Sequence, residues 1–423
     1  MKKLLVLFAN GFPFDQSEPF LALEIPLYPA YFDHTLLISG KKGQHDSVFS
    51  LHTSTMTVLP DRTMTLYLPD ILEAIPWVLT DTMFYKELFS LVFRSGFSWT
   101  KLHSLLAVTF CGNHRALLAH RWLRQHPEYE LQAIYGYWMQ IPAYAALRLK
   151  RITNCTCPTI SRAHGYDLYA NRVKDGYQPF HQQLYERLDL IAPVSLHGKQ
   201  TLVARYGSKA GLSVHYLGAA DHQTRNPCCG RSPLRLVSCS RVVPVKRLDR
   251  IIDALCMTAK EEPIIWTHLG GGDGLDALKR LASKLPGHVI AHFPGQLTGE
   301  QIYACYEHTP FHAFLNVSES EGISVAMMEA MSFGIPVIAT AIGGTPELVH
   351  DHVNGYLLDS AFQPLQLVSA LQAISHCDDA AFASMRAAAR CTYETSFRIP
   401  DNHHTFLAAI RGKDGEIRFE HPC

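Results

Sequence analysis

Short runs of apolar residues alternate with longer amphipathic stretches along most of the chain, and this alternation constrains the fold more than any other feature. Six runs in the first half have the length and composition of buried strands, namely "KLLVLFA", "HTLLIS", "MTVL", "LQAIYGYW", "PTISRAHG" and "LDLIAPVS". Stretches with a helical pattern lie between them, such as "EPFLALEIPLY" and "IPAYAALRLKR". Strands that alternate with helices in this way favour a parallel sheet with helices on both faces.

The same alternation restarts after a polar stretch between Ala219 and Pro233. Five more runs predict strands there, namely "LRLVSCS", "PIIWTHLGGG", "HVIAHFPG", "FHAFLNVS" and "IPVIAT". We therefore predict an α/β fold of two doubly wound, Rossmann-like domains, residues 1–220 and 234–391, which face each other across a cleft. Residues 392–423 are expected to form a tail or a helix that returns toward the first domain. Ligands of such sheets bind at the carboxyl ends of the strands, so the site is expected in that cleft.

A segment of about residues 70–126 interrupts the strands of the first domain. It is rich in aromatic residues with sparse Lys and Arg, and its pattern predicts two inserted helices. The exposed face of these helices is a candidate contact for a membrane or for a lipid-linked acceptor. The alternative is that the apolar residues only pack within the protein.

The composition is that of a globular protein with a formal charge of zero. The first 220 residues contain 21 Lys and Arg against 16 Asp and Glu, which suits an anionic acceptor or a membrane surface, although ordinary scatter between two domains would give the same difference. No apolar run reaches the roughly 20 residues that span a bilayer. The apolar start of the chain is too short for most secretory signals, so we expect a cytoplasmic protein, or one peripheral on the inner face of the membrane. No feature predicts a nucleic-acid partner.

The eleven cysteines do not indicate a metal site. Cys155 with Cys157 and Cys228 with Cys229 lack a matching second pair at zinc spacing. We therefore predict no metal.

One stretch, "SESEGISVAMMEAMSFGIPVIATAIGG", carries Glu321 and Glu329 with seven residues between them. It reads as a loop, then a helix over "ISVAMMEAM", then a strand. A helix that begins after Gly322 offers free backbone N–H groups and a partial positive charge, which suit phosphate or sugar hydroxyls. If the whole segment is helical, the two carboxylates lie roughly 12 Å apart along the axis and can contact two ends of one extended ligand. The alternative is that Glu329 only reaches solvent from an ordinary helix.

This stretch resembles the signature of the retaining, nucleotide-sugar-dependent family 4 glycosyltransferases, which have the GT-B fold. Every fixed residue of that frame is present: Ser318, Glu321, Gly322, Glu329, Ala330, Met331, Gly334, Pro336, Val337, Ile338, Ala339, Gly343, Gly344 and Glu347. Ile323 stands where many members have proline. The resemblance implies that Glu321 binds hydroxyls of the donor sugar and Glu329 those of the ribose, with Gly322, Ile323 and Ser324 also in the donor site.

The stretch "SCSRVVPVKRLDRIIDAL" resembles the family's phosphate clamp, which maps to Arg241 and Lys246. A departing nucleoside diphosphate develops negative charge, and two fixed cations with a helix N-terminus can stabilise it without a metal. No Asp-x-Asp motif of the metal-dependent kind occurs in the chain. The alternative for the two cations is a solvated strand end. We expect no cofactor, because the nucleotide sugar is a co-substrate.

Three further stretches resemble family motifs. His164 in "SRAHGYDLY" corresponds to a histidine that faces the donor sugar, and Asp167 is a candidate acceptor contact. "NGFPFDQSEPF" supplies only Gly11 where other members have a glycine-rich loop near the donor phosphates, and its Glu18 is a second acceptor candidate. Gly295 in "HFPGQLTGEQI" corresponds to the loop beside the nucleotide base.

The resemblance implies a retaining, metal-independent hexosyl- or N-acetylhexosaminyl-transferase whose catalytic set is His164, Glu321, Arg241 and Lys246. The expected donor is a UDP-sugar, and the expected acceptor is a saccharide or lipid-linked hydroxyl of bacterial surface polysaccharide or glycolipid. The alternatives are a GT-B-fold phosphorylase, a nucleotide-sugar epimerase of that fold, or a non-catalytic sugar-binding subunit.

Overall fold

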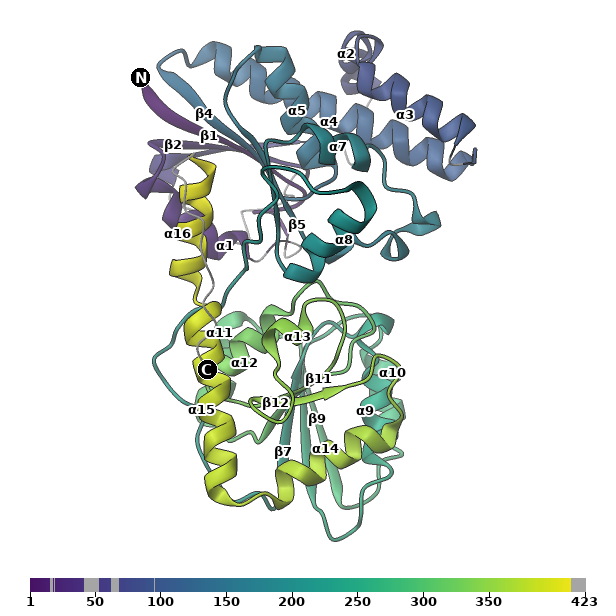
Figure 1. The fold of residues 1–423 in the computed structure, drawn as a ribbon, viewed down its shortest axis with the longest axis vertical. Helices are drawn as coiled ribbons and strands as arrows, with labels where there is room; N and C mark the ends of the chain where they lie inside the picture. The colour runs from purple at the N-terminus through teal and green to yellow at the C-terminus, as the bar shows by residue number, and fades with distance from the viewer. Residues whose placement is uncertain (16–17, 19, 42–52, 62–67, 95, 412–423) are drawn as a thin grey trace. The chain divides into compact units, whose positions relative to one another are not determined.

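The computed structural model describes residues 1–15, 18, 20–41, 53–61, 68–94 and 96–411 (Figure 1). The chain divides into two compact units. Unit 1 runs from Met1 to His215 and includes the segment that begins at His403, and unit 2 runs from Tyr216 to Asn402.

Unit 1 is built on a parallel sheet with the strand order β3-β2-β1-β4-β5-β6. Its strands are β1 (Lys2–Ala9), β2 (His34–Ser39), β3 (Met56–Pro60), β4 (Tyr129–Gly136), β5 (Thr159–Ala163) and β6 (Leu190–Pro193). The six apolar runs predicted as strands therefore all form strands. The order reverses at β1, which lies between β2 and β4, so the carboxyl end of β1 borders the topological switch point where such sheets bind ligands.

Helices cover both faces of this sheet, and the side chains of β1 show why. Leu5 and Leu7 point into one buried cluster, whereas Leu4 and Val6 point into another, because successive side chains of a strand face opposite sides. The helices of unit 1 outside the insertion are α1 (Leu21–Glu24), α5 (Ile141–Thr153), α6 (Gly165–Leu168), α7 (His181–Arg187), α8 (Leu196–Tyr206) and α16 (Ile399–Ile410). Helix α16 contributes Phe406 to the cluster of Leu5 and Leu7.

The insertion contains three helices, α2 (Leu68–Leu79), α3 (Thr82–Phe93) and α4 (Trp99–Gln125), so the expectation of two was wrong. The extra break lies at Asp81, whose backbone is extended and whose side chain accepts the N–H of Met83 at 3.0 Å. This carboxylate therefore caps a new helix where the apolar pattern alone continues.

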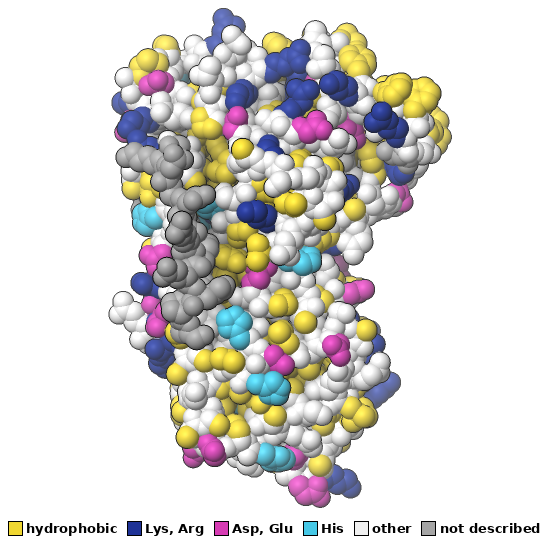
Figure 2. Space-filling model, in the orientation of Figure 1, with side chains coloured by type: hydrophobic (Ala, Val, Ile, Leu, Met, Phe, Trp, Pro, Cys, Tyr) yellow, Lys and Arg dark blue, Asp and Glu magenta, His cyan; other side chains and the backbone are white. Residues whose placement is uncertain are grey.

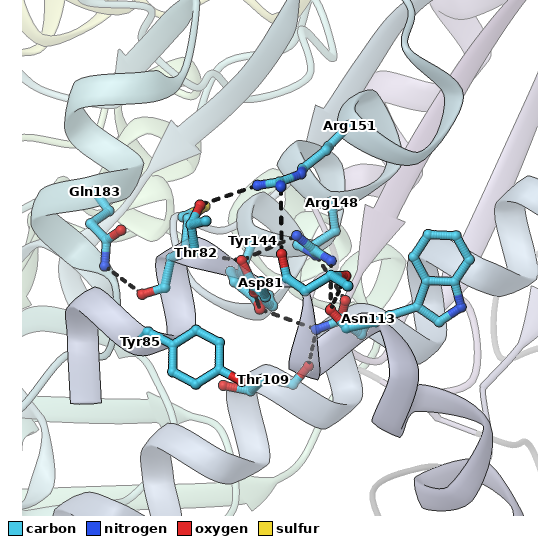
Figure 3. A network of polar contacts seen from close by, with 12 residues as sticks. Asp81, Thr82, Tyr85, Thr109, Asn113, Tyr144, Arg148, Arg151 and Gln183 are labelled. Carbon is cyan, nitrogen blue, oxygen red and sulfur yellow. Dashed lines mark hydrogen bonds and ion pairs between the residues drawn. The ribbon is translucent and has the colours of Figure 1, made fainter. Parts of the chain in front are cut away.

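A buried polar network anchors the insertion to the rest of unit 1 (Figure 3). Asp81 is fully buried, pairs with Arg148 of α5 at 3.1 Å and accepts a hydrogen bond from the hydroxyl of Tyr144. Asn113 of α4 donates to the Tyr144 hydroxyl at 3.1 Å and accepts from Arg148 Nε at 2.8 Å. Arg151 donates to the hydroxyl of Thr82 at 3.1 Å. Helix α3 is thus fixed at its first turn by side chains of α4 and α5.

Unit 2 has a second parallel sheet, with the order β12-β11-β10-β7-β8-β9. Its strands are β7 (Leu234–Cys239), β8 (Ile264–Leu269), β9 (Val289–Gly295), β10 (Ala313–Asn316), β11 (Val337–Thr340) and β12 (Gly355–Leu358). Its helices are α9 (Leu248–Leu255), α10 (Leu275–Ala282), α11 (Gly299–His308), α12 (Val325–Ser332), α13 (Thr345–Leu348), α14 (Pro364–His376) and α15 (Asp379–Ser396). The order reverses at β7, which lies between β10 and β8. The predicted α/β fold with two doubly wound units is confirmed.

Candidate active site

The loops that follow β7 and β10 meet at the carboxyl edge of the sheet in unit 2. The two strands are neighbours, so residues that leave their carboxyl ends lie close together. Lys246, at the end of a 3₁₀ turn after β7, donates from Nζ to Oε1 of Glu321 at 2.5 Å. Glu321 lies on the loop after β10 and is only 8% exposed. The structure therefore brings together the cation of one predicted motif and the carboxylate of the other.

Arg247 fixes these two loops to each other and was missed by the sequence analysis. Its guanidinium donates to the carbonyls of Val317 at 2.7 Å, Ser318 at 3.0 Å and Ser360 at 2.9 Å. Its backbone has φ 48°, the left-handed region that non-glycine residues rarely adopt. A second basic residue next to Lys246 was the only signal in the sequence, and charge alone does not distinguish a structural from a ligand-binding role.

Arg241 follows β7 on the same loop as Lys246 and is exposed. Its side chain makes no hydrogen bond or ion pair with another described residue. The guanidinium is therefore available to an anionic ligand. Its predicted contact with phosphate remains a prediction.

Residues 322–324 form the approach to helix α12. The helix begins at Val325, later than the predicted start at Ile323, because Ser324 is extended, with φ −90° and ψ 115°. The Ser324 side chain makes no capping hydrogen bond, so it satisfies none of the first N–H groups of the helix. The Gly322 carbonyl accepts the N–H of Gly344 at 2.7 Å. Glu321 lies before the helix, so the roughly 12 Å helical separation from Glu329 does not apply.

Glu329 lies within α12 and is partly buried. The hydroxyl of Tyr303 donates to its Oε1 at 2.9 Å. Burial raises the pKa of Glu329 to about 7, while this hydrogen bond acts in the opposite direction. The carboxyl group therefore titrates near neutral pH, and only its ionised form has two oxygens that accept hydrogen bonds from hydroxyl groups.

Gly295 ends β9 at the far edge of the same sheet. Its φ of 83° is a conformation that favours glycine, and open space surrounds the position where a side chain would begin. The turn geometry explains a glycine here. The predicted contact with a nucleotide base remains a prediction.

In unit 1, His164 follows β5 and is 7% exposed. Both ring nitrogens are buried and have no hydrogen-bond partner among the described residues; Nδ1 lies 3.7 Å from Oδ2 of Asp167, and the ring packs against Trp138 with centroids 4.4 Å apart. Asp167 accepts the backbone N–H of His164 at 2.6 Å and that of Met139 at 2.9 Å. Asp167 is fully buried, so here it holds two loops together. The contacts of His164 with a donor and of Asp167 with an acceptor remain predictions.

Glu18 is the centre of the loop after β1. The carboxylate is fully buried and accepts the N–H groups of Asn10 at 2.9 Å, Gly11 at 2.8 Å and Phe12 at 2.8 Å. It also accepts the indole N–H of Trp138 at 2.6 Å. Three successive backbone N–H groups that converge on one point form an anion-binding concavity, and the protein's own carboxylate fills it here. This geometry favours a loop-ordering role for Glu18, and the predicted ligand contacts of Gly11 and Glu18 remain predictions.

A second buried cluster holds the ends of neighbouring strands. Asp61, directly after β3, pairs with Arg115 Nε at 3.1 Å and with His114 Nδ1 at 3.0 Å. Arg115 also donates to the carbonyl of Ala9, the last residue of β1, at 3.3 Å. The sequence analysis missed this cluster, because a histidine and an arginine on a long helix do not reveal which strand ends they contact.

None of the described helices has the length and apolar character needed to cross a bilayer. In the same part of the chain, no three His, Cys, Asp or Glu side chains gather closely enough to hold a metal ion.

Comparison with solved structures defines the fold. The two six-stranded parallel sheets with flanking helices match solved GT-B glycosyltransferases. The apo form of the lipopolysaccharide outer core galactosyltransferase WaaB aligns over 97% of this chain and 100% of its own, with a TM-score of 0.68 and 15% identity. Anabaena Alr3699/HepE in complex with UDP-glucose aligns over 96% of this chain and 99% of its own, with a TM-score of 0.65 and 16% identity. At these identities the likeness shows the fold alone.

Sequence comparison identifies a conserved domain in unit 2 and a related protein. Residues 231–391 match the family model described as Glycosyl transferases group 1. The putative colanic acid biosynthesis glycosyltransferase WcaL of Escherichia coli (strain K12) is 28% identical over 242 residues, which are 55% of this chain and 59% of that protein. The chain therefore spans about six tenths of the length of this relative. The matched domain contains Arg241, Lys246, Glu321 and Glu329.

Proposed function

We propose that the chain is a retaining glycosyltransferase of the family 4 type, which moves a hexosyl or N-acetylhexosaminyl group from a nucleotide-diphosphate donor to an acceptor hydroxyl. The first donor to test is a UDP-sugar. The proposed acceptor is a saccharide or a lipid-linked saccharide, in the synthesis of a bacterial surface polysaccharide or glycolipid at the cytoplasmic side of a membrane. The observation that carries the proposal is the ion pair of Lys246 with Glu321 inside the matched domain.

The proposed donor site uses groups that lie at the carboxyl edge of the sheet in unit 2. Arg241 and Lys246 would hold the diphosphate, together with the N–H groups at the start of α12. Glu321 would accept hydrogen bonds from hydroxyls of the sugar, and Glu329 from hydroxyls of the ribose. A nucleotide-diphosphate sugar is an anion with hydroxyls at both ends, on the ribose and on the sugar. The two carboxylates, the two cations and the helix N-terminus match this polarity.

The proposed reaction needs no covalent intermediate with the protein. The bond between the anomeric carbon and the leaving phosphate oxygen breaks, and the acceptor oxygen forms a new bond on the same face of the sugar. The acceptor proton passes to the departing phosphate. Negative charge grows on that phosphate, so fixed cations and oriented N–H groups lower the barrier most at this point. We propose that these groups replace a metal.

The test is a screen of UDP-, GDP- and ADP-sugars by thermal shift, followed by release of the nucleoside diphosphate. We expect one donor class to bind and to turn over slowly, with and without EDTA. Arg241→Ala should lower turnover about 10²–10³-fold, whereas Arg280→Ala, which replaces an exposed arginine on α10 of the same unit, should leave it unchanged. If no nucleotide sugar binds or turns over and Arg241→Ala changes nothing, the proposal is wrong.

The same assay separates the other candidate activities. A phosphorylase would require orthophosphate, and an epimerase would convert the nucleotide sugar without an acceptor. A binding subunit would give a thermal shift and no turnover. Proton NMR of the first product formed with an acceptor would show whether the anomeric configuration is retained.

A further inference from the structure

The three inserted helices of unit 1 expose an unusual amount of apolar surface. More than half of the large hydrophobic side chains that are exposed in the described residues lie between residues 72 and 99. The most exposed of them are Phe93, at 71%, and Trp99, at 77%. Figure 2 shows hydrophobic side chains gathered over α2 and α3, with Lys and Arg side chains beside them. We call this area the insertion surface and define it by Leu79, Phe89, Val92, Phe93, Phe97 and Trp99.

Helix α3 is apolar on both of its sides. Its inner side places Met83 and Leu91 in a buried cluster of unit 1. Its outer side carries Phe89, Val92 and Phe93, which are exposed and follow the spacing of one helical face. A helix with apolar side chains on two opposite sides is normally covered on both, and the described residues cover only the inner side.

The aromatic side chains of the insertion surface pack on one another instead of folding back into the core. The rings of Phe89 and Phe93 have centroids 4.6 Å apart, and those of Phe97 and Trp99 are 5.2 Å apart. The network around Asp81 fixes the first turn of α3, the helix that carries Phe89 and Phe93 (Figure 3). A contiguous exposed patch of this kind marks an interaction site.

The charges around the insertion surface are unbalanced in one direction. Lys86 and Arg94 are exposed, and neither makes an ion pair with another described residue. Of the described acidic side chains nearby, Glu73 pairs with Arg121 at 3.0 Å, whereas Glu87 accepts hydrogen bonds from the neutral side chains of Tyr177 and Gln183 and keeps its charge. Lys86 and Arg94 together outnumber Glu87, so the net charge of these described groups beside the apolar rings is positive.

A hollow of about 330 Å³ adjoins this surface beside Trp99. Lys101 and His103 line it, and its one carboxylate, Asp175, accepts a hydrogen bond from the hydroxyl of Thr100 at 2.5 Å. The hollow therefore offers polar side chains of both charge signs next to the indole ring of Trp99.

We infer that the insertion surface binds the face of a lipid bilayer that carries anionic head groups. Aromatic rings with basic residues at their margin are the chemistry of helices that lie in the membrane interface. Helices α2 and α3 have 12 residues each, which is too short to span a bilayer, so they would lie along its surface. This inference goes beyond the proposed sugar transfer and does not depend on it, because binding is measured without donor or acceptor.

The test is flotation of the full chain with vesicles of phosphatidylcholine alone or with one third phosphatidylglycerol. We expect binding to the anionic vesicles, weakened by salt because the attraction of Lys86 and Arg94 is screened. The double variant Lys86→Gln with Arg94→Gln should weaken binding about thirtyfold, since each basic residue contributes about 1 kcal/mol near an anionic surface. The double variant Phe89→Ser with Phe93→Ser should abolish it.

The matched control is Ile290→Ser with Leu365→Ser, which removes two exposed apolar side chains of unit 2 and should bind as the unchanged protein does. Circular dichroism and the melting temperature show whether each variant is folded. The inference is overturned if the unchanged protein does not float with anionic vesicles at low salt, or if the folded Phe89→Ser, Phe93→Ser variant still floats. It is also overturned if the surface instead holds two copies together, which light scattering would show as a dimer that this variant dissociates.

Discussion

Glu18 offers the sharpest test of how unit 1 is held together. Glu18→Ala would leave the N–H groups of Asn10, Gly11 and Phe12 and the indole N–H of Trp138 without their common acceptor. Hydrogen bonds to a charged group contribute about 1.5–3 kcal/mol each, and buried unsatisfied donors cost about 1–3 kcal/mol each. Water that enters the space left by the side chain offsets part of this loss, so we expect unit 1 to lose about 3–5 kcal/mol of unfolding free energy.

Differential scanning calorimetry measures that loss directly. For a unit of this size, a decrease of 3–5 kcal/mol corresponds to a melting temperature lower by about 10 °C. The control is Glu130→Ala, which removes an exposed carboxylate from β4 of the same unit. Glu18→Gln separates the contacts, because one amide oxygen still accepts from the loop, while the NH₂ group faces the indole N–H of Trp138.

Formate tests whether an anion can replace the Glu18 carboxylate. If the concavity needs an anion, formate should fill the space in Glu18→Ala and raise its melting temperature in proportion to the logarithm of concentration. Trp138 packs against His164, so the proposed transfer activity should recover in parallel. If Glu18→Ala melts within about 1 °C of the unchanged protein and formate has no effect, the carboxylate does not hold the loop and the reasoning is refuted.

Three other predictions concern Arg241, Glu329 and Asp81. Arg241→Ala should change the unfolding free energy by less than about 0.5 kcal/mol, because the side chain bonds to no described residue, yet lower turnover of the donor about 10²–10³-fold in a nucleotide-release assay. Burial raises the pKa of Glu329 from 4.5 to about 7, so the contribution of this residue to the unfolding free energy falls as pH rises from about 4.5 to 7. Nucleotide affinity, measured by calorimetry, should increase through pH 7 because the carboxylate becomes ionised. Glu329→Gln should flatten both pH profiles. Asp81→Ala should cost unit 1 about 3–5 kcal/mol in denaturant unfolding, because Arg148 would stay buried without its carboxylate, whereas Asp175→Ala on the surface should cost little.

Periodicity was sufficient to predict most of the strands. Eleven of the twelve strands in the described residues overlap apolar runs that were predicted as strands, because buried parallel strands are apolar on both faces. The missed strand, β12 (Gly355–Leu358), is only partly buried at its two central residues and has three apolar residues after a polar stretch, so no clear apolar run marks it. Helix α1 ends after four residues, where "EPFLALEIPLY" predicts a longer helix, since Pro26 and Pro29 convert the continuation into a 3₁₀ turn.

The candidate site was predictable where it depends on spacing within one segment. The positions of Lys246 and Glu321 came from two separate motifs, and their pairing follows once β7 and β10 are known to be neighbours. The roles of Glu18 and Arg247 could not be predicted, because they depend on the directions of backbone N–H and carbonyl groups in loops. Residue type shows only that a charge is present, and backbone geometry decides what it contacts.

The ion pair of Lys246 with Glu321 has a consequence for selectivity. In the free protein, the ammonium group that would bind a phosphate is already neutralised by a carboxylate that is only 8% exposed. A free phosphate ion that draws Lys246 away offers Glu321 at most its own O–H groups in exchange for the ammonium, so a nearly buried carboxylate loses its cation. A sugar attached to the phosphate brings hydroxyls that can take the place of the ammonium. Under the proposed function, the ion pair would therefore favour a ligand that carries both a phosphate and hydroxyl groups over inorganic phosphate.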